Sequence, residues 1–148
     1  MRHWEDFRVG EVTELGSVDV TEEDVIAFAS RFDPQPFHID PEAAKETPFG
    51  GIIASGWHTM ALFMSLYVPM LKDTVSLGSP GVESIRWTKP VRPGDTLTAR
   101  NTVVETRPSA TNPARGTVLS TNEMINQRGE VVMTFTAWGH FGRRPTSS

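Results

Sequence analysis

Residues 32–67 read FDPQPFHIDPEAAKETPFGGIIASGWHTMALFMSLY, a proline-rich loop followed by a long apolar segment. Each of the two prolines, Pro34 and Pro36, fixes its own φ and moves the residue before it away from the helical region. We therefore expect an extended, stiff loop that holds Asp33 near His38. A carboxylate and an imidazole held in this way can share general acid–base catalysis. Because the same spacing is also common in surface turns, the hypothesis depends on the prolines and on the apolar segment that follows.

Helices are expected on both sides of this loop. Thr21 is a good N-cap for a helix that ends before Pro34, and Asp40 is a good N-cap for a short helix over residues 41–46. The longest predicted helix covers residues 54–68, and its side chains are apolar on nearly all sides. A helix of this kind is normally buried, so we expect the rest of the chain to enclose it.

The remaining segments are rich in Val, Thr and aromatic residues, which is typical of β-strands. The expected strands cover residues 11–20, 82–87, 96–106, 117–127 and 131–141. Since short turn-forming segments separate the last four, we predict that they form an antiparallel meander. The whole chain, residues 1–148, is expected to be one α+β domain in which a curled sheet surrounds the central helix.

Composition limits the possible functions. The 148 residues carry a net charge of −4 and include no cysteine, which rules out disulfides, thiolate catalysis and cysteine-bound metals. The mild negative charge disfavours nucleic-acid binding. No clustered set of His, Asp and Glu indicates a metal site. No apolar run is long enough to span a membrane, and no signal peptide is visible at the N-terminus, so we expect a cytoplasmic protein.

Four motifs together resemble the MaoC-like dehydratases, also called (R)-specific enoyl-CoA hydratases or hydratase 2 enzymes. They are WEDFRVGE at residues 4–11, DPQPFHID at 33–40, GIIASG at 51–56 and VRPGDTL at 91–97. The resemblance implies a hotdog fold, in which a curved antiparallel sheet wraps a long helix. It also implies a homodimer, or a higher assembly of dimers, in which two sheets join edge to edge. The implied reaction is the reversible hydration of a trans-2-enoyl-CoA to an (R)-3-hydroxyacyl-CoA, or the reverse dehydration, without a cofactor or metal.

The resemblance also implies roles for individual residues. Asp33 and His38 correspond to the catalytic dyad that activates water, and Gln35 replaces an Asn of the family and would support the substrate. Gly56 corresponds to the residue whose backbone N–H binds the thioester oxygen. That role agrees with the partial positive charge of a helix N-terminus, where N–H groups are unpaired. The alternative for Gly56 is close packing of the helix against the sheet.

Two other functions remain open at this point. One is a hotdog acyl-CoA thioesterase, in which a carboxylate directs water at the thioester carbonyl. The other is a non-catalytic acyl-binding protein that has kept the fold. Ser55 lacks the G-x-S-x-G context of a serine hydrolase, and His58 is expected to be a hydrogen-bonded structural histidine. Basic residues at strand ends are candidates for contacts with the phosphates of coenzyme A: Arg86, Lys89, Arg92, Arg107 and Arg115.

Overall fold

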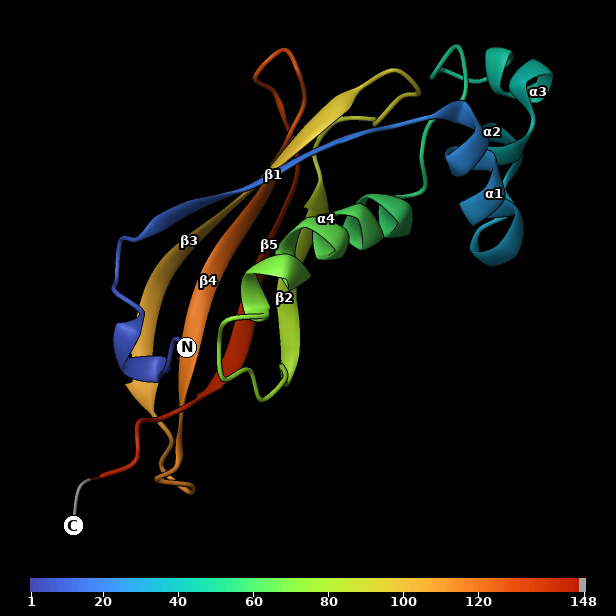
Figure 1. The fold of residues 1–148 in the computed structure, drawn as a ribbon. Coiled ribbons are helices and arrows are strands. Elements are labelled where there is room, and N and C mark those ends of the chain that lie inside the picture. Colours follow the sequence, from blue (N-terminus) through green and yellow to red (C-terminus); the bar gives the residue numbers. More distant parts are fainter. Residues whose placement is uncertain (147–148) are drawn as a thin grey trace.

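The computed structural model describes residues 1–146 and shows a five-stranded antiparallel sheet curved around one long helix (Figure 1). This confirms the predicted α+β class and the hotdog arrangement. The strands are β1 (Val12–Asp19), β2 (Gly81–Trp87), β3 (Thr96–Pro108), β4 (Arg115–Ile125) and β5 (Val131–Gly142). The helices are α1 (Glu22–Phe32), α2 (Pro36–Ile39), α3 (Pro41–Lys45) and α4 (Gly56–Leu71), preceded by a 3-10 turn at Trp4–Asp6.

The strand order across the sheet is β1-β3-β4-β5-β2. The bounds of the strands agree with the predicted ranges to within about two residues. The predicted four-stranded meander is wrong, however, because only β3, β4 and β5 are sequential neighbours, and β2 pairs with β5. The connection after β2 leads across to β3 on the far side of the sheet. Its residue Val91 accepts a hydrogen bond from the Ala54 N–H, just before α4, at 2.8 Å. β2 is therefore left as an edge strand, beside the N-terminal end of the long helix.

The core lies between α4 and the inner face of the sheet. Phe63 of α4 is 1% exposed and packs edge-on against Phe135 of β5, with ring centroids 4.8 Å apart. In β3 and β4 the buried residues alternate with more exposed ones, as expected for strands with one face toward a core. Other fully buried residues of these strands and of β5 are Leu97, Ala99, Met124, Val132 and Met133.

Helix α4 is less enclosed than its sequence predicts. Trp57 is 55% exposed, Met64 43% and Val68 44%, and their spacing places them on one stripe of the helix. The prediction that α4 is buried on nearly all sides is therefore wrong for a single chain. The helix also continues past Pro69 to Leu71, which is possible because the backbone hydrogen bond that proline removes involves the carbonyl of an exposed residue, Ser65.

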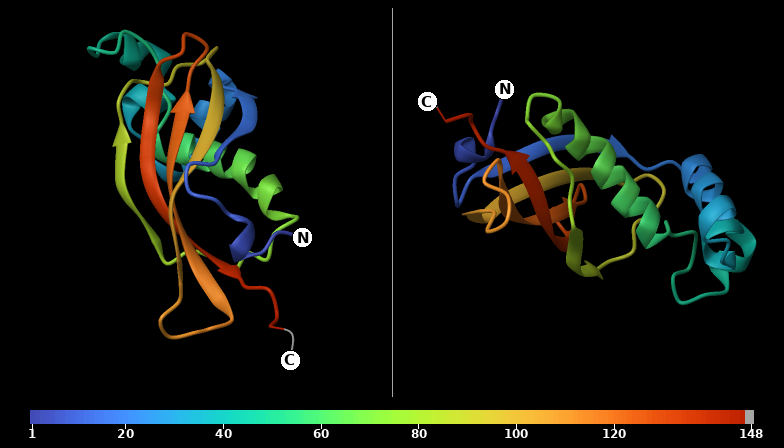
Figure 2. Two further views of the ribbon diagram at one scale, coloured as in Figure 1. Left: turned by 90° about the vertical axis from the view of Figure 1, so that its left-hand side faces the viewer. Right: turned by 90° about the horizontal axis from the view of Figure 1, so that it is seen from below.

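The three shorter helices lie together at one end of the molecule, beyond the N-terminus of α4 and away from the sheet (Figures 1 and 2). Both predicted caps in this region are confirmed. The Thr21 side chain accepts from the Asp24 N–H at 3.1 Å, and the Asp40 carboxylate accepts from the N–H groups of Glu42 and Ala43. Among the described residues, no helix is both long enough and apolar enough to cross a membrane.

Candidate active site

The segment that carries Asp33 and His38 is partly helical. Asp33 is the C-cap of α1, and its N–H donates to the Ala29 carbonyl at 2.8 Å. Pro36 then begins the one-turn helix α2, which contains His38. The expectation of a fully extended loop is therefore wrong. Proline excludes helical conformation only for the residue before it, here Gln35, while its own φ suits the first position of a helix.

The two predicted dyad residues lie side by side. His38 Nε2 is 3.3 Å from Asp33 Oδ2, and the His38 side chain is 6% exposed compared with 21% for Asp33. The other ring nitrogen, Nδ1, lies 2.7 Å from the Ile53 carbonyl oxygen. Because a carbonyl only accepts hydrogen bonds, Nδ1 carries a proton and donates it. Nε2 is therefore the nitrogen that can exchange a proton with a molecule bound beside Asp33.

The Asp33 carboxylate has a donor on each oxygen. Gln35 Nε2 donates to Oδ1 at 2.6 Å and Ser55 Oγ donates to Oδ2 at 2.8 Å. The hydrogen bond from Gln35 is the largest influence on the Asp33 pKa and lowers it below the ordinary value, and the Ser55 bond and the nearby His38 act in the same direction against partial desolvation. The carboxylate is therefore ionised at neutral pH.

Ser55 is a functional candidate that the sequence reasoning missed. Its side chain is fully buried and is the N-cap of α4, where it also accepts from the Trp57 N–H at 3.3 Å. One hydroxyl therefore joins Asp33 to the start of the long helix. The available signal was a serine directly before the glycine that begins an apolar helix, which is a typical N-cap pattern.

Gly56 is the first residue of α4 and packs closely against β2. Its carbonyl accepts from Trp87 Nε1 at 2.9 Å, and a Cβ on Gly56 would lie only 2.3 Å from Cε2 of that ring. The structure thus shows the close packing considered as the alternative for Gly56. No hydrogen bond within residues 1–146 uses the Gly56 N–H, which is one of the free donors of the helix N-terminus. Close packing against Trp87 and a free N–H for the thioester oxygen are therefore compatible at Gly56.

A hollow of about 400 Å³ brings the predicted residues together. Asp33, Gln35, His38 and Gly56 all line it. Its other walls come from the loop before α4, the first turns of α4, and the end of β2 with the residues that follow, including Ile53, Trp57, Thr59, Trp87 and Lys89. The structure therefore places a carboxylate, an imidazole and a helix N-terminus around one space.

The other candidates lie mostly outside this hollow. His58 is 6% exposed and stacks on Phe28 of α1, with ring centroids 4.8 Å apart, and burial lowers its pKa. It is a packed structural residue as predicted, but the prediction that it is hydrogen-bonded is wrong, because its buried Nδ1 has no partner within the described chain. Of the five basic residues, only Lys89 lines the hollow, and it forms an ion pair with Glu130. Within residues 1–146 no cluster of three potential metal ligands occurs.

Comparison with known proteins supports the resemblance. The family model described as "MaoC like domain" matches residues 7–124. A solved MaoC-like dehydratase from Rhodospirillum rubrum is 41% identical, with a TM-score of 0.90, and the match covers 99% of this chain and 100% of that one. The R-hydratase PhaJ1 of Pseudomonas aeruginosa is 25% identical, with a TM-score of 0.76 over 99% of this chain and 95% of its own. The 3-hydroxyacyl-thioester dehydratase Z of Mycobacterium tuberculosis is 33% identical over 110 residues, which are 72% of this chain and 73% of that protein. The chain described here therefore belongs to the MaoC-like domain family.

Proposed function

We propose that this protein is a hydro-lyase that hydrates a trans-2-enoyl-CoA to the (R)-3-hydroxyacyl-CoA and catalyses the reverse dehydration. The observation that carries the proposal is the 3.3 Å approach of His38 Nε2 to Asp33 Oδ2, inside a hollow that also contains the N-terminus of α4. The names of the relatives support it, since those quoted above are hydratases or dehydratases.

The dyad would hold the water that reacts. Asp33 Oδ2 is an ionised acceptor and lies next to His38 Nε2, so a water bound beside the two atoms would donate to both. Its oxygen forms a bond to C3 of the enoyl group, and one of its protons leaves through the dyad. A proton is returned to C2 on the same face. The net change is the addition of H and OH across one double bond, so no oxidant or other reactant is required.

The start of α4 would stabilise the charge that develops on the substrate. As C3 is attacked, negative charge moves to the thioester oxygen. The Gly56 N–H is unpaired at a helix N-terminus, where the backbone dipoles favour negative charge. Ser55 fixes the position of this N–H relative to Asp33, because its hydroxyl contacts both the carboxylate and the first turn of α4.

We also propose that two copies of the chain form a homodimer. Six of the seven residues of the edge strand β2 are exposed, and the stripe of α4 with Trp57, Met64 and Val68 is exposed and apolar. An unpaired strand edge and an apolar stripe are both surfaces that a second copy can cover. Sedimentation measurements test this assembly, and a monomer at micromolar concentration would contradict it.

Hydration is tested by the loss of enone-thioester absorbance after crotonyl-CoA is added. We expect rapid loss with the wild type, and a rate lower by about 10²- to 10⁴-fold in Asp33→Asn and in His38→Ala, the range for removal of a general acid or base. Asp40→Asn is the matched control, because Asn also caps a helix well and Asp40 lies outside the hollow. Circular dichroism verifies folding of each variant.

Other outcomes would replace the proposal with one of the alternatives. Release of free thiol without loss of the enone would indicate a thioesterase. Binding of acyl-CoA without either reaction, over a panel of short, long and branched enoyl groups, would indicate an acyl-binding protein. Equal rates in the wild type and both dyad variants would contradict the assignment of Asp33 and His38.

A further inference from the structure

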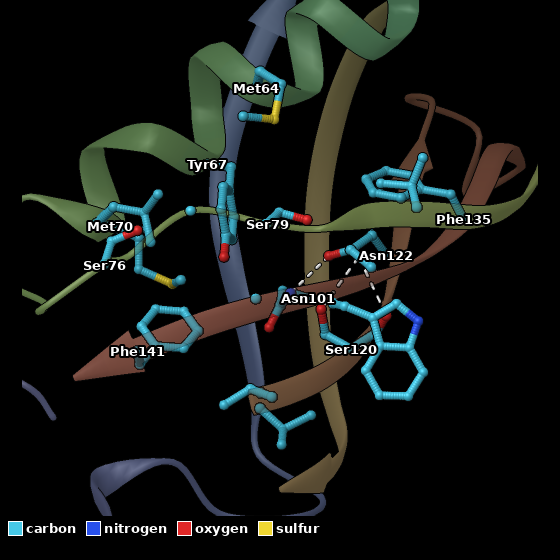
Figure 3. Close-up of a pocket in the computed structure, with 18 of the residues that line it drawn as sticks. Met64, Tyr67, Met70, Ser76, Ser79, Asn101, Ser120, Asn122, Phe135 and Phe141 are labelled. Atoms are coloured by element: carbon cyan, nitrogen blue, oxygen red, sulfur yellow. Dashed lines mark hydrogen bonds between the residues drawn. The ribbon is translucent and has the colours of Figure 1, made fainter. Parts of the chain in front are cut away.

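A second cavity lies between the C-terminal half of α4 and the inner face of the sheet, with a volume of about 210 Å³ (Figure 3). Its walls are mainly apolar and include Phe63, Met64, Tyr67, Phe135 and Phe141. None of the residues of the dyad hollow lines it. It is therefore a separate space, and nothing in the proposed reaction at Asp33 uses it.

The two spaces are nevertheless lined by the same side of α4. Gly56 and Thr59 line the dyad hollow, and Phe63, Tyr67 and Met70 line the second cavity. Steps of three and four residues place all five on one stripe of the helix. The distance along the axis from Gly56 to Phe63 is about 10 Å at 1.5 Å per residue. A substrate acyl chain that starts at the helix N-terminus and follows this stripe would reach the second cavity.

Strand β2 also lines both spaces. Trp87, near its end, lines the dyad hollow, and Val82, near its beginning, lines the second cavity. Two elements, α4 and β2, therefore run from one space to the other. Because Gly56 and Trp87 are in contact, an acyl chain whose thioester lies at Gly56 would follow the stripe of α4 past this contact, and a short chain such as crotonyl would end before the cavity.

The sheet side of this cavity is unexpectedly polar. Asn101 and Asn122 are directly opposite each other on β3 and β4, and the Asn101 Nδ2 donates to the Asn122 Oδ1 at 2.6 Å. Asn122 in turn approaches the Ser120 hydroxyl at 3.4 Å. The three residues are 7%, 2% and 8% exposed, respectively. Figure 3 shows them together on the sheet, facing the apolar side chains of α4.

Asn101 retains unused hydrogen-bonding capacity. Within residues 1–146 no donor contacts its Oδ1, although the residue is more than nine-tenths buried and lines the cavity. This oxygen is open to the cavity, because it is not among the fully buried unpaired polar atoms of the described chain. A ligand with a hydroxyl or an N–H in the cavity would supply the missing donor.

The cavity contains no charged partner. No Asp, Glu, Lys, Arg or His side chain is among the described residues that line it. The Tyr67 phenol is neutral, since burial raises its pKa. A carboxylate in this space would be buried without a counter-charge, which is strongly unfavourable. The chemistry of the walls thus favours a neutral group that donates a hydrogen bond.

We propose that the second cavity receives the far end of the acyl group and selects a medium-chain acyl group that carries a neutral hydroxyl there. This rests on the proposed hydration of enoyl-CoA. The hydroxyl donates to the Asn101 Oδ1, while the methylene groups contact Phe63, Tyr67 and Phe135. Asn122 is a positioning residue, because its bond to Asn101 leaves the Oδ1 of that residue free for the substrate.

The experiment compares three enoyl thioesters of equal length: trans-2-octenoyl-CoA, its derivative with a terminal hydroxyl, and its derivative with a terminal carboxylate. We expect the wild type to have a kcat/KM about tenfold higher for the hydroxyl derivative than for the plain chain, the effect of one hydrogen bond. The carboxylate derivative should be the poorest of the three. In Asn101→Leu/Asn122→Leu, the ratio of hydroxyl to plain chain should fall to about one.

The double substitution removes both partners of the Asn101–Asn122 hydrogen bond, so neither amide is left buried and unpaired. Its melting temperature verifies that it folds. Thr121→Val is the matched control, because Thr121 lies on β4 between Ser120 and Asn122 but points to the opposite face and is exposed. It should keep the wild-type ratio.

Two results would overturn the proposed acyl selection but not the proposed hydration. They are an equal kcat/KM for the hydroxyl and plain chains in the wild type, and an unchanged ratio in the double variant. In both cases the plain octenoyl thioester is still hydrated, so the proposed reaction stands. Absence of hydration for every enoyl thioester, crotonyl-CoA included, would overturn the proposed function and the acyl selection with it.

Discussion

The two ends of helix α4 are built by different interactions. At its N-terminus, Ser55, Asp33 and His38 are held by hydrogen bonds to atoms on both sides of the helix start. Farther along, Phe63 is held by apolar contacts with the sheet, such as the edge-on packing against Phe135. Hydrogen bonds depend on distance and direction, whereas apolar burial depends mainly on area.

This difference separates stability from activity along one helix. Loss of a single atom at the N-terminal end should alter the chemistry with little effect on folding. Loss of a side chain farther along should weaken the fold with less effect on the reacting atoms. Substitutions along α4 can therefore test the division directly.

The largest effect is expected for Phe63→Ala. Removal of a fully buried Phe typically lowers the free energy of unfolding by about 3–5 kcal/mol, through lost burial and the cavity that remains. Urea unfolding measures the change. Val12→Ala is the control, because Val12 on β1 is 58% exposed and lies outside the proposed interface, and it should cost less than about 1 kcal/mol. Val68→Ala tests the exposed stripe of α4 separately, and a large loss of stability there would indicate that a second copy covers this stripe.

A smaller effect, mainly on activity, is expected for Gly56→Ala. The added Cβ would lie 2.3 Å from the Trp87 ring, so the ring or the helix start must move, and we expect a loss of about a hundredfold in kcat/KM for crotonyl-CoA, comparable with the loss of one oxyanion donor. This substitution alone does not distinguish close packing from binding of the thioester oxygen.

The double variant Gly56→Ala/Trp87→Ala makes that distinction when it is compared with Trp87→Ala. If Gly56 serves only the packing, the two variants should have equal rates, because the ring that the Cβ would strike is absent. If the substrate must also approach the Gly56 backbone closely, the double variant should stay slower than Trp87→Ala. We expect the second result.

The sequence predicts local features of this site better than its long-range contacts. The proximity of Asp33 and His38 follows from five residues of constrained chain, and the caps at Thr21 and Asp40 follow from their own side chains. The contact of Ser55 with Asp33 does not, because the two residues are 22 apart in sequence and meet only when α1 packs near α4.

Long-range contacts also limit how much of the fold the sequence predicts. Turn-forming residues predict the hairpins of β3, β4 and β5, but the position of β2 beside β5 depends on a connection that crosses to the other side of the sheet. The exposed stripe of α4 was also missed. An apolar helix face has the same composition whether its own sheet or another copy of the chain covers it.

A moderate effect is expected for Ser55→Ala. The change removes the N-cap of α4, which costs about 1 kcal/mol, and also one of the two donors to the Asp33 carboxylate, so we expect kcat to fall by about tenfold. Thr21→Ala is a matched control, because it removes the equivalent cap of α1 outside the hollow. The two variants should lose similar stability in thermal unfolding. An equal loss of kcat in both would show that Ser55 acts only as a cap.

The smallest effect is expected for Gln35→Leu and should appear mainly in the pH profile. The Gln35 amide is the principal cause of the low pKa of Asp33, so its removal raises that pKa toward the ordinary value. Since the ionised carboxylate is the active form in the proposed reaction, the acid limb of kcat/KM should move to higher pH. Gln127→Leu is the control, because Gln127 donates to Asp95 in the same way but outside the hollow.

The hydrogen bond from Gln35 to Asp33 also predicts how the free energy of unfolding depends on pH. A carboxylate whose pKa is lower in the folded chain stabilises the fold above its unfolded pKa, and this contribution is lost as the pH falls through the folded value. Gln35→Leu should therefore be less stable than the wild type at neutral pH, and the difference should disappear at low pH, where Asp33 is protonated in both proteins. A difference in stability that does not change with pH would show that Gln35 stabilises the segment by packing, and that the low pKa of Asp33 has another cause, with the Ser55 hydroxyl as the remaining donor.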